Sequence, residues 1–149
     1  MRAVSLSVAL IFAAAPVLAQ TTPPAAAPAV RVPLPNDSLA IARRFVEWLW
    51  TSQVDSLLAH SPASERTPEN RQQMLDGIAQ MQARAGNETA LVEERWVRRN
   101  GMRQYWRVAR FSDFTDEPVV LRLVIAPNGE MLGMGFNPLS RVPPIDPEP

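Results

Sequence analysis

The spacing of apolar residues changes from a helical period to a strand period near the middle of the chain. From residue 38 to residue 58, apolar side chains recur every three or four positions, as on the buried face of a helix. Asp37 or Ser38 can cap the first helix, and Thr51-Ser52-Gln53 separates it from a second, shorter helical piece. The apolar positions of the two pieces are Leu39, Ala42, Phe45, Val46, Leu49, Val54, Leu57 and Leu58.

A further helix is predicted to begin at Thr67-Pro68-Glu69. Threonine is a good N-cap, proline suits the first helical position, and an acidic residue in the first turn complements the helix dipole. Gly86-Asn87 ends this helix. Its apolar face contains Met74, Leu75, Ile78 and Met81.

From residue 88 onwards the pattern alternates with a period of two, which predicts strands. Asn100-Gly101, between strands 88–99 and 102–111, favours a type I′ two-residue turn. Pro127-Asn128-Gly129, between strands 119–125 and 131–136, favours a three-residue hairpin loop. Helices followed by four antiparallel strands predict an α+β fold, with the N-terminal helices packed on the sheet.

The turn chemistry also predicts how the strands are paired. In the second hairpin, Gly133 and Gly135 would lie opposite Leu123 and Leu121, on a strand pair that is apolar on both faces except at Arg122. The first hairpin would carry an aromatic pair, an ion pair and a small apolar pair on one face: Trp96 opposite Tyr105, Glu94 opposite Arg107, and Val92 opposite Ala109.

A sheet that is apolar on both faces needs cover on both sides. The helices can cover only one side of a four-stranded sheet. We therefore expect the outer face to be covered by a second copy of the chain, as a homodimer, or by the proline-rich tail at residues 138–149.

The ends of the chain differ in composition from the middle. Residues 1–19 have an early arginine, a short apolar run and small residues before a cleavage position, which is the pattern of a secretory signal peptide. Residues 20–35 are rich in proline and alanine and predict a disordered spacer. The folded domain would therefore be 36–137, followed by the tail at 138–149. The protein would be exported, to the periplasm or the medium.

Charge and composition exclude several classes of site. The chain has 15 basic residues, all arginine, 15 acidic residues and no cysteine, so disulfides and thiolate metal sites are absent and no positive field attracts nucleic acid. No later segment is long and apolar enough to span a membrane after the signal is removed. His60 is the only histidine and is expected at the surface or at a helix end. We expect no metal and no organic cofactor.

The order of patterns resembles the NTF2-like superfamily, also described as the cystatin-like α+β cone, and more closely its small exported bacterial domains of an uncharacterised family. The resemblance implies a curved sheet around a helix, a conical pocket between them and frequent dimers through the outer sheet face. Members of the superfamily include isomerases, dehydratases and cyclases, and also domains that only bind. The residues that carry it are Ala42-x-x-Phe45-Val46-x-x-Leu49, Val54-Asp55-x-Leu57-Leu58, Met74-Leu75-x-x-Ile78 and Val124-Ile125-x-x-x-Gly129-Glu130-x-x-Gly133-x-Gly135-Phe136-x-Pro138.

The cone between the first helix and the sheet is the predicted pocket. We expect a non-catalytic domain that binds a small apolar or anionic ligand, or a protein partner. The alternative is a cofactor-free isomerase, lyase or hydrolase that uses Tyr105 and a buried carboxylate, for which the acidic candidates are Glu93, Glu94 and Asp76. The predicted pocket residues are Phe45, Trp48, Leu49, Trp96, Tyr105 and Trp106.

Two observations would separate these alternatives. A carboxylate in the cone away from any arginine would favour an enzyme, whereas an apolar or fully paired cone would favour a binding domain. The arginines of the first hairpin are either a solvated charged face or a site for an anion. They are Arg95, Arg98, Arg99, Arg103, Arg107 and Arg110.

Overall fold

Three α-helices precede four antiparallel strands in the computed structural model, which describes residues 37–142 and 144–145. The strand order is β1-β2-β3-β4, so the predicted α+β fold is confirmed. The predicted signal peptide and spacer lie outside the described residues. The elements are α1 (Ser38–Trp50), α2 (Val54–Ala59), α3 (Pro68–Ala85), β1 (Glu88–Arg99), β2 (Met102–Phe111), β3 (Phe114–Ile125) and β4 (Met131–Pro138), with short 3-10 turns η1 (Ala63–Glu65) and η2 (Leu139–Arg141).

The predicted helix caps are formed. The Asp37 carboxylate accepts hydrogen bonds from the backbone N–H groups of Leu39 and Ala40, at 3.1 and 3.3 Å. Thr67 Oγ1 accepts from the N–H of Asn70 at 3.2 Å, directly before the proline that begins α3. None of the helices among the described residues is long and apolar enough to cross a membrane.

The first hairpin has the predicted turn and most of the predicted register. Asn100 and Gly101 both have positive φ, at 51° and 72°, as a type I′ turn requires. Trp96 pairs with Tyr105 and Glu94 with Arg107, as expected. The prediction for Val92 was wrong: an irregularity in the pairing between Leu91 and Glu93 places Leu91 opposite Ala109.

The predicted register of the second hairpin was wrong by one residue. The loop closes as expected, because the N–H of Ala126 donates to the carbonyl of Glu130 at 2.8 Å. Ile125 pairs with Met131, but Val124 then pairs with Gly133, so Leu132 is an extra residue in β4. The shift moves Gly135 opposite Arg122. It also turns Met134 and Phe136 to the same side as Leu123 and Leu121, their partners on β3.

The third strand is longer than the alternating pattern predicted, because it begins at Phe114 rather than Val119. Pro118 lies within it and has no N–H to donate to a neighbouring strand. The pairing with β2 is irregular at this position, between the Ala109–Val119 and Phe111–Phe114 pairs. The irregular pairing accommodates the proline.

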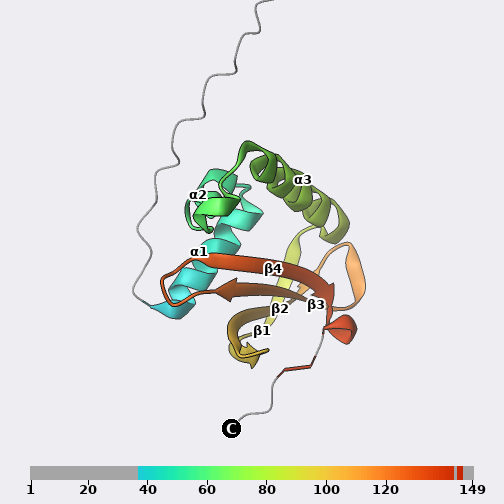
Figure 1. The fold of residues 1–149 in the computed structure, drawn as a ribbon. Helices are drawn as coiled ribbons and strands as arrows, with labels where there is room; N and C mark the ends of the chain where they lie inside the picture. The colour runs from blue at the N-terminus through green and yellow to red at the C-terminus, as the bar shows by residue number, and fades with distance from the viewer. Residues whose placement is uncertain (1–36, 143, 146–149) are drawn as a thin grey trace, which may run out of the picture.

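The main core lies between the helices and one face of the sheet, here called the inner face (Figure 1). Helix α1 contributes Phe45 and Leu49, which are fully buried, and the inner face contributes Tyr105, Leu121 and Leu123. Helices α2 and α3 extend the same core through residues such as Leu57, Leu58 and Ile78.

The opposite, outer face carries a second apolar cluster, composed of Val97, Trp106, Val108 and Val120. Val142, which follows η2, packs against this cluster. Two hydrogen bonds tie η2 to β3, since the Ser140 N–H and hydroxyl both donate to the Glu117 carboxylate at 2.8 Å. The described start of the 138–149 tail therefore covers part of the outer face.

Candidate ligand site

The structure distributes the six predicted pocket residues over three environments. Trp106 lies on the outer face and belongs to the apolar cluster there. Trp96 alone lines an open pocket near the tip of the first hairpin. The other four fill the space between α1 and the sheet as core residues, namely Phe45, Trp48, Leu49 and Tyr105.

His60 occupies the C-cap position of α2, which is the helix-end position of the two that were expected, and it is buried rather than exposed. Its ring stacks on Trp48, with centroids 5.3 Å apart, and meets Phe45 edge-on. The carbonyl of His60 accepts a hydrogen bond from the N–H of Met131 at 2.8 Å. This bond to the start of β4 holds the residue inside the fold.

Between α1 and β1, at the edge of this core, lies a mostly buried carboxylate, Glu94, that is surrounded by donors. Arg43 contacts both of its oxygens, with Nε at 3.0 and 3.2 Å. The Tyr105 hydroxyl donates to it at 2.7 Å, and Arg107 Nη1 lies 3.6 Å away. Arg107 itself forms a closer pair with Glu88, at 2.6 and 3.0 Å.

These contacts determine the protonation states in the cone. The hydrogen bonds from Arg43, with a smaller contribution from Tyr105, lower the pKa of Glu94 even though burial opposes this. Burial and the hydrogen bond to Glu94 raise the pKa of Tyr105 to about 12. Glu94 is therefore an ionised, weakly basic carboxylate, and Tyr105 is a neutral donor.

The other two acidic candidates lie outside the cone. Asp76 accepts a hydrogen bond from Gln72 on the exposed side of α3, at 2.9 Å. Glu93 pairs with Arg95 at 3.3 Å, with both side chains nearly half exposed. Within the part of the chain that the structure describes, no group of three histidine, aspartate or glutamate side chains could hold a metal ion.

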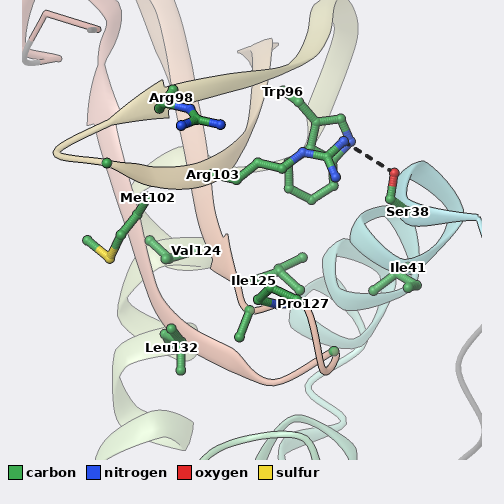
Figure 2. Close-up of a pocket in the computed structure, with 13 residues that line it drawn as sticks. Ser38, Ile41, Trp96, Arg98, Met102, Arg103, Val124, Ile125, Pro127 and Leu132 are labelled. Atoms are coloured by element: carbon green, nitrogen blue, oxygen red, sulfur yellow. Dashed lines mark hydrogen bonds between the residues drawn. The ribbon is translucent and has the colours of Figure 1, made fainter.

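A pocket of about 490 Å³ opens between the N-terminus of α1, the tip of the first hairpin and the end of β3 (Figure 2). We call it the mouth pocket. Most of its lining is apolar, and within residues 37–142 and 144–145 no acidic side chain belongs to it. The residues that line it include Ser38, Ile41, Trp96, Arg98, Arg103 and Leu132.

Two arginines of the hairpin tip supply the charge of the mouth pocket. Arg98 and Arg103 are directly opposite each other in the β1–β2 pairing. The Arg103 guanidinium lies 4.1 Å from the centre of the Trp96 ring, and its Nη2 donates to Ser38 Oγ at 3.5 Å (Figure 2). Neither arginine forms an ion pair with another described residue.

Sequence reasoning singled out Trp96 and the arginines of this hairpin but missed the apolar wall of the pocket. The apolar wall comes from the start of α1 and from the β3–β4 loop, around Ile41, Val124, Pro127 and Leu132. These segments are far apart along the chain, so no local pattern could have grouped them. Comparison of the chain with family models, with curated proteins and with solved structures finds no match. The NTF2-like assignment therefore stays a prediction.

Proposed function

We propose that this chain is an exported, non-catalytic domain that binds a small ligand in the mouth pocket. One observation carries the proposal. Core side chains fill the space between α1 and the sheet, and the carboxylate of Glu94, which borders a shallow hollow of about 420 Å³ together with Arg43 and Arg107, is paired. The pocket at the hairpin tip is larger, at about 490 Å³, and more enclosed. A ligand would therefore enter at the tip of the first hairpin rather than between α1 and the centre of the sheet.

The pairing of Glu94 supports binding over catalysis. A general base needs a pKa near the working pH and access to the proton that it removes. Glu94 is hydrogen-bonded to Arg43 and Tyr105, and its pKa is lowered, so it is a poor base. This is the paired cone that favours a binding domain. The alternative, a cofactor-free isomerase, lyase or hydrolase, has only the contact between Glu94 and Tyr105 in its favour.

The mouth pocket has the usual character of a small-molecule site. Such sites have volumes of about 300–1,000 Å³ and mostly apolar walls with a few polar groups. The mouth pocket falls in this range and combines apolar side chains with Ser38, Arg98 and Arg103.

Binding of an uncharged apolar probe tests the proposal. We expect N-phenyl-1-naphthylamine to gain fluorescence with the protein, and Leu132→Asp to weaken this binding because it places a charge on the pocket wall. Leu139→Asp is the control, since Leu139 is similarly exposed, at 44% against 51% for Leu132, and does not line the pocket. Equal binding by both variants, or no binding by the parent protein, would contradict the proposal.

The homodimer through the outer sheet face also stays a proposal. The four residues of the outer cluster are buried within the single chain, and Val142 packs on them, so a second copy would use the exposed residues around the cluster, such as Arg95. Light scattering that finds a dimer in the parent protein and in Arg95→Glu alike would place the interface elsewhere.

A further inference from the structure

We infer that the ligand of the mouth pocket is an amphipathic oxyanion, with a carboxylate or phosphate head group held by Arg98 and Arg103 and an apolar body against Ile41, Val124 and Leu132. This inference rests on the mouth pocket being the ligand site. It specifies that the ligand carries a negative charge, and that its head group lies at the hairpin tip with its apolar body along the apolar wall.

The positive charges of the two arginines repel each other. Arg98 and Arg103 are directly opposite each other on adjacent strands, and like charges in this position destabilise a hairpin. A single acidic neighbour would relieve this repulsion, yet the described residues that line the pocket include none. An oxyanion between the two guanidinium groups would supply the missing charge, and guanidinium forks match carboxylate and phosphate oxygens.

The acidic residues of this hairpin are already paired with other residues, away from the hairpin tip. Glu94 is held by Arg43 and Tyr105. Glu88 pairs with Arg107 and Glu93 with Arg95. All three acids lie at least four residues before Arg98 along β1, so among the described residues the tip keeps an unneutralised positive charge.

Hydrogen-bond donors at the site are held in place before any ligand binds. Arg103 is stacked on Trp96 and hydrogen-bonded to Ser38, which fixes its guanidinium at the pocket wall (Figure 2). Trp96 Nε1 is buried and has no hydrogen-bond partner in the part of the chain that the structure describes. A buried donor without an acceptor is unfavourable, so a ligand oxygen that reached it would be favoured.

The apolar wall determines the rest of the ligand. Figure 2 shows the arginines at the hairpin end of the pocket and Ile41, Ile125, Pro127 and Leu132 toward α1 and the β3–β4 loop. A bare inorganic anion would leave this wall in water. A ligand with a head group and an apolar body would cover both parts.

The test is a titration with four compounds that share an eight-carbon alkyl chain, monitored by isothermal calorimetry and Trp fluorescence. They are octanol, octanoate, octyl phosphate and octyltrimethylammonium. We expect one or both anions to bind at least about tenfold more tightly than octanol, since charge-assisted hydrogen bonds have that magnitude. We expect the cation to bind less tightly than octanol. The better of the two anions identifies the head group.

Variants at the tip show where the anion binds. Arg98→Gln and Arg103→Gln should each reduce the preference for the anion over octanol, and together should abolish it, while octanol binding remains. Arg98→Gln is the cleaner variant, because Arg103 also packs on Trp96. Arg84→Gln, an exposed change on α3 outside the pocket, is the matched control and should have no effect.

The outcomes separate the inference from the proposed function. Equal binding of octanol and both anions, or an anion preference that survives the double variant, would overturn the inference while leaving a ligand site in the mouth pocket. Absence of binding by all four compounds, together with no binding of N-phenyl-1-naphthylamine, would overturn both. The anion preference should also weaken as salt increases, because the arginines are exposed.

Discussion

Replacement of Glu94 by glutamine tests whether the cone contains a structural ion network or a catalytic carboxylate. The change keeps the size of the side chain and removes its charge. The Tyr105 hydroxyl can still donate to the amide oxygen, so the buried donor is not left unsatisfied. What is lost is the additional strength of a hydrogen bond to a charged acceptor, on a side chain that is only 12% exposed.

The magnitude follows from these contacts. Hydrogen bonds to charged groups contribute about 1.5–3 kcal/mol to stability and neutral ones about 0.5–1.5 kcal/mol, so Glu94→Gln should cost about 1–2 kcal/mol at pH 7. The contact with Arg43 adds little, because that guanidinium is exposed and screened by solvent. Urea denaturation followed by Trp fluorescence measures the difference.

The pH dependence provides a second measurement. The pKa of Glu94 is lowered in the folded protein, so its contribution to stability is present above the unfolded value of about 4.5 and is lost as the pH falls through the folded value. The difference between parent and Glu94→Gln should therefore shrink below pH 4.5. Tyr105→Phe, which removes the hydroxyl and keeps the ring, should also destabilise the parent by about 1 kcal/mol.

Two results would refute this reasoning. If Glu94→Gln left stability unchanged at pH 7, the network would have no structural role. If the difference between the two proteins grew as the pH fell, the sign of the pKa shift would be wrong. Unchanged stability together with loss of a measured turnover would instead favour the enzyme alternative.

Three further predictions concern the outer face and the N-terminus. Val142→Asp should destabilise the domain by about 1–3 kcal/mol in urea, because it places a charge against the outer cluster, whereas Ile145→Asp, at a residue 38% exposed, should not. Gly133→Ala should be neutral or slightly stabilising, since its added Cβ meets nothing within 4 Å. Gly135→Ala should cost less than about 1 kcal/mol relative to Gly133→Ala, because its Cβ would lie 2.7 Å from Arg122 Nη2, the end of a flexible side chain that can move aside; a larger difference between the melting curves would contradict this. N-terminal sequencing of the exported protein should begin at Gln20, and an uncleaved precursor would refute the signal peptide.

Much of the fold could be predicted because its signals are local. The caps at Asp37 and Thr67 and the turn at Asn100-Gly101 each depend on a few neighbouring residues, and the structure contains all of them. The extra residue at Leu132 could not be found in this way. It turns Phe136 to the inner face, where Phe136 packs against the main core, and that packing exists only once the strands and helices are assembled.

The candidate site was predictable only in part. The arginine-rich hairpin was visible in the sequence, but both of its faces contain charged and aromatic residues, so the inner face could not be chosen. Trp106 was consequently grouped with Trp96 although the two lie on opposite faces. Arg43 and Glu94 are 51 residues apart, so no local sequence pattern predicts their ion pair. The burial of His60, whose carbonyl is hydrogen-bonded to the start of β4, likewise had no local sequence signal.

The position of Val142 has a consequence for synthesis of the chain. The outer cluster of Val97, Trp106, Val108 and Val120 is complete once β3 has formed, but the residue that packs on it comes after β4 and η2. During synthesis from the N-terminus, this apolar stripe therefore stays exposed until almost the whole domain has been made. It is the surface on which nascent chains would associate with one another, and a chaperone that binds extended apolar segments would protect it during that interval.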